Sequence, residues 1–377
     1  MVAEKGASAR AGLLTKRALV IASHAVEHAA LSDVGLEQAV VIAMFQRLPY
    51  FEREREVYAR IAQRAKATVV GMVDRSRPDL PPGVTPVLLS ADEQLASEWS
   101  VAVLSPTFGA SVVAQDLAEV EDQVTSLEAA RLFDGRWGFR RDESYAEIVR
   151  LRDALGDRLP PPVRAAIDST LRSVVLPAAT EVEVRTEAAL RHLAGRLVEQ
   201  RSGYATLRQE VAQEKGYGRD PWTGLHTLGS LPGWLGISAP GTLALGLTLL
   251  RVTELPWLAA RLGSQVSMHT EINIADALHA EIRTCDQAVR VSKDEFLLVQ
   301  PAVSGAEANN TARTVLDRLE ELGETYPFVR LSGTAAVTVS ADRPLPLNRL
   351  RSQLREREPE LAGSLSGTLA GPNEWFR

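Results

Sequence analysis

The sequence predicts an α/β protein in which a helical linker joins two α/β domains. Its length is the first observation, since 377 residues exceed what one hydrophobic core usually organises. In both halves, short β-branched runs alternate with amphipathic helical segments. Between the halves the strand signals stop and helical spacing takes over. We therefore expect domains at 1–155 and 216–377, with the linker at 156–215.

The first domain alternates helices with strands. Apolar residues such as Leu19, Ala22 and Val26 recur at helical spacing and predict a helix over 18–31. The run 39–45 is short, continuous and β-branched, as a buried strand would be. The other expected elements are a charged helix at 51–65, strands at 67–73, 85–90, 99–105 and 108–117, and a solvated hairpin at 133–142.

The linker carries a seven-residue repeat of mainly apolar positions. One set of positions holds Leu190, Leu197, Tyr204 and Val211, and the other holds Leu193, Gln200 and Leu207. Such a seam suits a parallel coiled coil, which would make the protein a homodimer, or a helix that packs within its own chain. Gly203 weakens the helix and Gln200 weakens the seam, so both interpretations stay open.

The second domain begins where Gly, Pro and Asp residues break the helical pattern at 216–224. Strands joined by a very short turn are expected at 288–291 and 295–300. The remaining expected elements are a strand at 242–252, helices at 255–263 and 272–283, a helix at 306–322, a strand at 328–340 and a charged helix at 348–357.

Composition excludes several classes of protein. The 42 Lys and Arg residues against 48 Asp and Glu give a net charge of -6, which disfavours a general nucleic-acid binder. The stretch from Met1 to Lys16 has no apolar core, so it is not a signal peptide. The apolar run from Leu243 to Leu250 is far shorter than the ~20 residues of a membrane span. With Cys285 as its single cysteine, the chain forms no intrachain disulfide, and we expect a cytoplasmic protein without a membrane partner.

Two separated motifs in the second domain resemble those of the GGDEF (diguanylate cyclase) family. The first runs from Asp220 to Leu225 as DPWTGL, close to the family's DxLTGL opening. The second is Ser292-Lys293-Asp294-Glu295-Phe296, at the turn where the family has its signature. The resemblance covers roughly residues 215–370 and implies the nucleotidyl cyclase fold. It also implies a chemistry that joins two GTP molecules with the help of divalent metals.

The same resemblance implies that this chemistry is lost. The family's metal-binding Asp-x-Asp falls on Arg251 and Thr253, and a guanidinium repels a cation instead of binding it. The two guanine-reading positions fall on Ala259 and Met268, which cannot make the paired hydrogen bonds that specify the base. Ser292 and Lys293 replace the glycines that let backbone amides approach the phosphates. We expect a pseudoenzyme without a bound metal or cofactor.

One further family feature is present in register. Arg283 and Asp286 match the RxxD inhibitory site, at which active relatives bind cyclic di-GMP. An arginine fork pairs a phosphate, while a carboxylate accepts hydrogen bonds from a guanine edge. The alternative is an ordinary surface pair of a helix-end arginine and aspartate, worth a few tenths of a kcal/mol. The sequence thus predicts cyclic di-GMP as a ligand, with both side chains facing solvent, or else a surface pair.

The first domain resembles the DICT sensory domain over about residues 15–155. The motifs are Ser23-His24-Ala25-Val26-Glu27, then Phe45-Gln46-Arg47 followed by Phe51, Glu54 and Tyr58, and then Glu98-Trp99 with Ser105-Pro106. The resemblance implies a domain that senses a signal and names no ligand. We therefore expect signal transduction, with the second domain as an output that binds a signalling protein or cyclic di-GMP.

Two alternatives to this function remain. His24-Ala-Val-Glu27-His28 spells H-x-x-E-H, which on a helix places both histidines on one face and is known from some zinc peptidases. Polar residues on a helix surface are the preferred interpretation, because motifs of five residues recur by chance. An enzyme with residual nucleotide chemistry or metal chemistry is one alternative to the signalling protein. A purely structural dimeric scaffold is the other.

Overall fold

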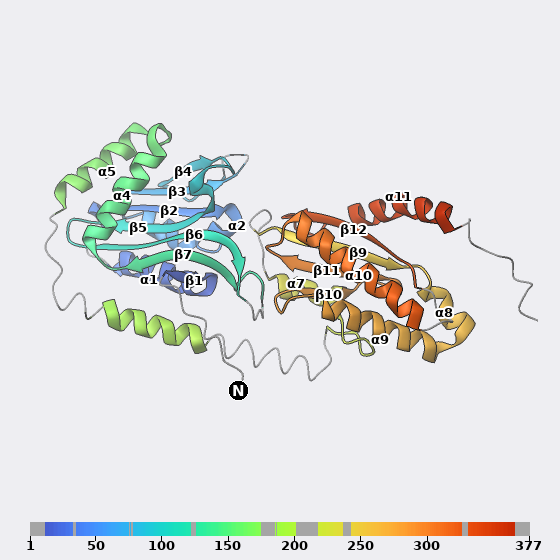
Figure 1. Ribbon diagram of the computed structural model, residues 1–377. Helices are drawn as coiled ribbons and strands as arrows, with labels where there is room; N and C mark the ends of the chain where they lie inside the picture. Colours follow the sequence, from blue (N-terminus) through green and yellow to red (C-terminus); the bar gives the residue numbers. More distant parts are fainter. Residues whose placement is uncertain are drawn as a thin grey trace, which may run out of the picture. The chain divides into compact units, whose positions relative to one another are not determined.

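The computed structural model describes residues 12–32, 35–74, 76, 78–121, 126–174, 185, 187–200, 218–236, 243–325 and 331–365. They divide into two compact units, of which the first comprises Met1–Glu121 with Glu128–Leu207 and the second comprises Asp122–Leu127 with Arg208–Arg377. Each unit has its own mixed sheet with helices packed on it (Figure 1), which confirms the predicted α/β class for both halves.

The sheet of the first unit has seven strands in the order β1-β7-β6-β5-β2-β3-β4. Their bounds are β1 Leu13–Thr15, β2 Val40–Arg47, β3 Ala67–Val73, β4 Val84–Leu89, β5 Glu98–Leu104, β6 Gly109–Val120 and β7 Arg131–Gly138. Strands β2, β3 and β4 run parallel, whereas β5, β6, β7 and β1 pair antiparallel. The central strands are buried on both faces, which explains why their sequences are continuous apolar runs.

Helices cover both faces of this sheet (Figure 1). On one face α4 (Arg141–Leu155) and α5 (Pro161–Ser173) pack against alternate residues of β2, including Val40 and Ile42. On the other face α1 (Lys16–Ser32) lies along β5 and β6 and buries Leu19, Ala22 and Val26. The short helices α2 (Leu48–Phe51) and α3 (Arg55–Ala62) connect β2 to β3.

Three expected boundaries in this half are wrong. The charged helix at 51–65 is broken into α2 and α3, because the break lets both Phe51 and Tyr58 reach the core, where they contact Phe45. Segment 133–142 is strand β7 running into α4, not a hairpin. The linker does not begin at 156, because α5 buries Ile167 in the core of the first unit.

The sheet of the second unit has five strands in the order β12-β9-β11-β10-β8. The elements are β8 His226–Thr227, α7 Leu231–Leu235, β9 Leu245–Val252, α8 Leu255–Leu262, α9 Ser264–Ala280, β10 Gln287–Arg290, β11 Glu295–Pro301, α10 Gly305–Thr325, β12 Gly333–Ser340 and α11 Leu347–Leu365. Each strand and helix predicted from the sequence in this half has a counterpart, but α9 begins eight residues before the helix expected at 272–283, and residues 328–330 of the strand expected at 328–340 lie outside the described residues. The turn between β10 and β11 holds the expected signature.

The two faces of this sheet differ in what covers them. Leu250 and Val252 of β9 point into a core formed with α8, α9 and α10. Because side chains alternate along a strand, Arg251 points to the opposite face, where α11 contacts β9 and β12. The cross-strand partner of Arg251 is Glu295 at the start of β11. The sheet therefore places an arginine and a glutamate side by side under α11.

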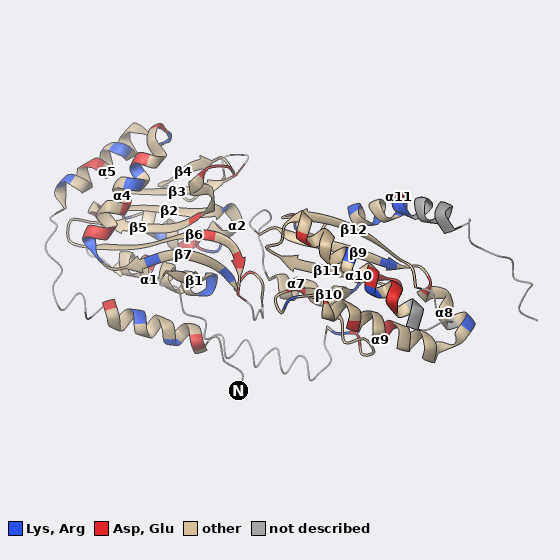
Figure 2. Cartoon of the chain, in the orientation of Figure 1, with Lys and Arg blue, Asp and Glu red and all other residues tan. Residues whose placement is uncertain are grey.

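In Figure 2 basic and acidic residues alternate along α4 and α5, instead of forming a run of one sign. A surface that binds nucleic acid usually carries a run of basic residues. Among the helices that the structure describes, none combines the length and hydrophobicity needed to cross a bilayer.

Candidate functional sites

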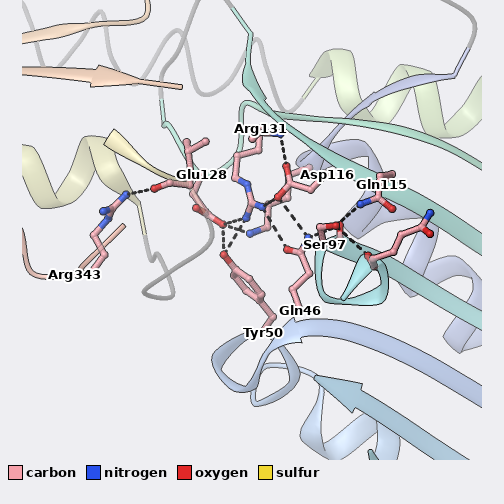
Figure 3. Close-up of polar contacts among 12 residues, drawn as sticks. Gln46, Tyr50, Ser97, Gln115, Asp116, Glu128, Arg131 and Arg343 are labelled. Carbon is pink, nitrogen blue, oxygen red and sulfur yellow. Dashed lines mark hydrogen bonds and ion pairs between the residues drawn. The ribbon is translucent and has the colours of Figure 1, made fainter. Parts of the chain in front are cut away.

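A cluster of charged side chains is buried inside the first unit (Figure 3). Its centre is Arg131 on β7, whose side chain is fully buried. The guanidinium donates to Glu128 Oε1 at 3.1 Å and to the carboxylate of Asp116 on β6. The hydroxyl of Tyr50 donates to the same Glu128 oxygen at 2.6 Å. The cluster thus connects α2 to β6 and β7.

Lys16 at the start of α1 completes the cluster. Its ammonium pairs with Glu128 and lies 3.7 Å from the centre of the Tyr50 ring. Burial lowers the pKa of Lys16 to about 7, although Glu128 favours the charged form. Burial acts to raise the pKa of Glu128, but Lys16 and Arg131 outweigh it and hold that pKa below its ordinary value. The fold therefore contains an amine whose charge changes near neutral pH.

Few of the sequence motifs predicted this cluster. The expected motif around Gln46 contributes a side chain, because its amide oxygen accepts from Arg131 at 3.4 Å. Trp99, also expected, stacks on Tyr50 with ring centres 6.4 Å apart. Lys16, Glu128 and Arg131 were missed because they come from distant parts of the chain, and their only local signal is a charge beside apolar residues.

In the second unit, the signature residues lie at the β10–β11 turn, as predicted. Ser292 Oγ donates to Asp294 Oδ1 at 2.7 Å and accepts from the backbone N–H of Glu295 at 3.1 Å. Neither Ser292 nor Lys293 has a positive φ, so non-glycine residues fit this turn without strain. Phe296 is fully buried in the core. The hydroxyl of Ser292 thus closes the turn where the family has glycines.

Two arginines bind the carboxylate of Glu295. Carboxylates in turns are usually solvated, but this one is not. Arg251 Nη2 donates to Oε1 at 2.6 Å. Arg351 on α11 donates to Oε2 from Nη2 at 2.9 Å and from Nε at 3.0 Å. Burial acts to raise the pKa of Glu295, but Arg351 and then Arg251 outweigh it and lower the pKa. Both carboxylate oxygens therefore already have cationic partners.

The other expected positions have structural environments. Asp220 Oδ1 accepts from the backbone N–H and hydroxyl of Thr223 at 2.9 and 2.8 Å, which closes the turn of the first motif. Its Oδ2 accepts from Arg290 on β10 at 3.2 Å. Thr253 is exposed in the turn after β9, Met268 is half-buried on α9, and Ala259 lies on α8.

The expectation that Arg283 and Asp286 both face solvent is wrong for Asp286. The side chain of Asp286 is fully buried, whereas that of Arg283 is half exposed. The Asp286 carboxylate accepts from Arg283 Nη2 at 2.8 Å, from Arg283 N at 3.0 Å and from Gln300 Nε2 at 3.1 Å. Arg283 also donates to the carbonyl of Pro301 at 2.7 Å. The pair thus ties the loop before β10 to β11.

Residues 2–117 match the family described as DICT, the sensory domain in diguanylate cyclases and two-component systems, so this part of the first unit is a DICT sensory domain. The remainder of the chain resembles GGDEF domains in solved structures. No curated protein matches the chain.

Three of those structures give the extent of the likeness. Diguanylate cyclase SiaD of Pseudomonas aeruginosa, solved with its activator SiaC, is 19% identical with a TM-score of 0.36 and covers 58% of this chain and 85% of its own. The GGDEF domain of DgcB from Caulobacter crescentus, solved with c-di-GMP, is 13% identical with a TM-score of 0.34. The match covers 38% of this chain and 91% of the DgcB domain. LapD of Vibrio cholerae is 19% identical with a TM-score of 0.33. The match covers 42% of this chain and 38% of the LapD chain. Such likeness concerns the fold, and the chemistry has to be argued from the residues of this chain.

Proposed function

We propose that the DICT domain controls a GGDEF-like unit that makes no cyclic di-GMP and acts instead as a protein-binding output. The observation that carries this proposal is the pairing of Arg251 with Glu295 at 2.6 Å. Arg251 stands where the family's metal-binding aspartate is expected, and it occupies one oxygen of a signature carboxylate. Arg351 occupies the other oxygen.

The residues at this position do not fit a magnesium ion. Mg²⁺ requires oxygen ligands in near-octahedral geometry at about 2.0–2.1 Å. To coordinate it, Glu295 would have to give up two charge-assisted hydrogen bonds, and the cation would then lie beside the Arg251 guanidinium. Asp294 offers a half-buried carboxylate, but its Oδ2 lies 3.9 Å from Arg251 Nε. We therefore derive no step of GTP chemistry at this site.

Incubation of the full-length protein with GTP and either Mg²⁺ or Mn²⁺, with the products separated by chromatography, tests the loss of catalysis. We expect no cyclic di-GMP above the level without protein. The variant Arg251→Asp is the matched comparison, and it is also expected to be inactive because Thr253, Met268 and Ser292 remain. Turnover by the wild-type protein would contradict the proposal. Turnover by the variant alone would show that Arg251 is the only barrier.

Cyclic di-GMP as the ligand of the output is the second candidate. Its motif, Arg283 with Asp286, is present, but the Asp286 carboxylate is buried and already accepts from three donor groups. A guanine edge would have to displace them. Calorimetry with cyclic di-GMP separates the candidates, and we expect no heat beyond dilution. Binding that Arg283→Ala abolishes, while the exposed Arg313→Ala leaves it intact, would favour the second candidate.

We also propose that the protein is a homodimer joined through the linker. In the described helix 187–200, Leu190, Leu193 and Leu197 of the expected seam are exposed to solvent. Tyr204, Leu207 and Val211 of the seam lie outside the described residues. Light scattering should give the mass of a dimer. Leu193→Glu with Leu197→Glu should dissociate it, while His192→Glu, off the seam on the same helix, should not. A monomeric wild-type protein would contradict this proposal.

A further inference from the structure

Three side chains of the first unit that can bind metals come together outside the buried charge cluster. They are His24 and Glu27 on α1 and Glu54, which directly precedes α3. One potential ligand atom from each lies within 4.8 Å of the other two, and His24 Nε2 is 2.9 Å from Glu54 Oε1. His28, the expected second histidine of the H-x-x-E-H motif, is exposed and outside this group. The fold thus replaces His28 with a carboxylate from another segment.

The fold fixes where these ligands point. Leu19, Val26 and Ala30 of α1 are fully buried, which sets the rotation of the helix and brings Glu27 inward. Tyr58 donates to Glu27 Oε1 at 3.1 Å and Ser23 donates to the same oxygen at 3.3 Å. Both donors act on the same oxygen and so orient the carboxylate.

We propose that His24, Glu27 and Glu54 form a binding site for a divalent first-row transition-metal ion, with Zn²⁺ as the ion of choice. One imidazole and two carboxylates suit such ions better than Ca²⁺ or Mg²⁺, which prefer oxygen ligands alone. With metal–ligand bonds of about 2.0–2.1 Å, tetrahedral ligand atoms lie roughly 3.3 Å apart. The His24–Glu54 distance of 2.9 Å and the upper limit of 4.8 Å for the other pairs bracket this value. The His24 side chain is about half exposed, which would let water act as a further ligand.

The electrostatics of the metal-free cluster agree with this site. Two carboxylates held this close, one of them buried, cost free energy when both are ionised. A divalent cation removes that cost by pairing both charges at once.

A metal at this position would connect two segments of the sensory unit. His24 and Glu27 lie on α1, whose first residue is Lys16, and Glu54 follows α2, which carries Tyr50. Lys16 and Tyr50 are both in the buried charge cluster. Binding would therefore tie α1 to the α2–α3 segment at a second point. The metal site is argued from its own geometry. Only the interpretation of the metal as the signal that the DICT domain senses rests on the proposed function.

Calorimetric titration of the chelator-treated full-length protein with Zn²⁺ tests the site. We expect a binding event that weakens by at least about tenfold in His24→Ala and in Glu54→Gln. His28→Ala, one turn further along α1, should bind as the wild type does and is the matched control. Circular dichroism of each variant verifies that it is folded. A parallel titration with Mg²⁺ should give no event at this site.

Two results would overturn the metal site. One is Zn²⁺ binding that His24→Ala and Glu54→Gln leave unchanged, which would place the ion at other histidines. The other is the absence of Zn²⁺ binding in the folded wild-type protein. Loss of binding in His28→Ala would likewise reject the proposed ligand set in favour of the two-histidine motif. Production of cyclic di-GMP from GTP would refute the proposed function without affecting any of these titrations.

Discussion

Each unit contains a network of arginines and carboxylates, and the two networks differ in how completely they are removed from water. In the first unit, Arg131 is fully buried, and its partners Asp116 and Glu128 are nearly so. In the second unit, the side chain of Glu295 is as buried as those two carboxylates, but Arg351, which reaches it from α11, is one-third exposed. The chemistry of the pairs is the same, and only the surroundings change.

This difference determines what each network contributes. Burying an ion pair costs several kcal/mol of desolvation free energy per ion. When one partner is removed, the other charge stays buried without compensation, and the fold is strongly destabilised. A half-exposed pair is screened and is worth about 0–1 kcal/mol. The fold of the sensory unit therefore depends most on Arg131, which Asp116 and Glu128 share as a partner. The network around Glu295 tolerates a loss, because two arginines share one carboxylate.

The largest expected effect follows from removing the central cation of the buried cluster. Arg131→Met should lower the free energy of unfolding of the first unit by about 3–5 kcal/mol, since Asp116 and Glu128 keep their burial and lose their shared partner. Urea unfolding measures it. The control is Arg140→Met, which breaks an exposed pair with Asp142 and should cost less than about 1 kcal/mol. Equal costs in the two variants would contradict the comparison.

The second prediction concerns pH and the same cluster. Lys16 titrates near 7 in the folded protein and near 10.5 when unfolded, so the unfolded state binds more protons between these values. Stability should therefore rise with pH, by about 2 kcal/mol from pH 7 to 9. Glu27, whose pKa burial raises to about 7, offsets a small part of this rise, and the buried Cys285 and Tyr58, whose pKa values are raised, oppose it increasingly as the pH approaches and passes 9.

Urea unfolding at pH 7, 8 and 9 checks this dependence. The variant Lys16→Met should show a flatter profile, because it lacks the titrating amine and keeps Arg131 as a partner for Glu128. If the two profiles were parallel, the charge of Lys16 would not be linked to folding.

The sequence predicted the elements better than the contacts between them. Helices and strands of the second unit follow periodic apolar patterns, and these patterns reflect the same burial that the fold satisfies. The helix at 51–65 failed because Phe51 and Tyr58 need different backbone directions to reach one core. Local propensity contains no such information, since it depends on where Phe45 of β2 lies.

The candidate sites show the same limit. The β10–β11 turn was predicted because its residues are contiguous. Arg351 was not, because it reaches Glu295 across 56 residues of chain. In the same way Glu54 reaches His24 across 30 residues. A motif within one helix, such as that of His24 and His28, predicts which residues share a face of that helix. It does not predict which other segment packs against that face.

A third prediction corrects the expected behaviour of Arg283. Because Asp286 is buried, Arg283→Ala should lower the free energy of unfolding of the second unit by about 1–2 kcal/mol, although the sequence predicted almost no effect. The loss is limited, since Asp286 keeps Gln300 and a backbone N–H as donors. Thermal unfolding measures it, with the exposed Arg313→Ala as the control. An unchanged melting temperature would mean that Arg283 contributes nothing to the fold and is free for a ligand.

The smallest expected effect is that of Arg351→Ala. Arg351 is partly exposed and Arg251 remains on Glu295, so the loss should be about 0.5 kcal/mol, as for a screened pair. Arg349→Ala on the same helix is the matched control, because it makes the same change in helix propensity. Adding Arg251→Ala to Arg351→Ala should cost more than the sum of the two single changes, since Glu295 is then buried without a cation. If the changes in the free energy of unfolding of the single variants add up to that of the double variant, the two arginines act independently. The network around Glu295 would then not behave as a coupled cluster, and exposure would not be its only difference from the buried cluster.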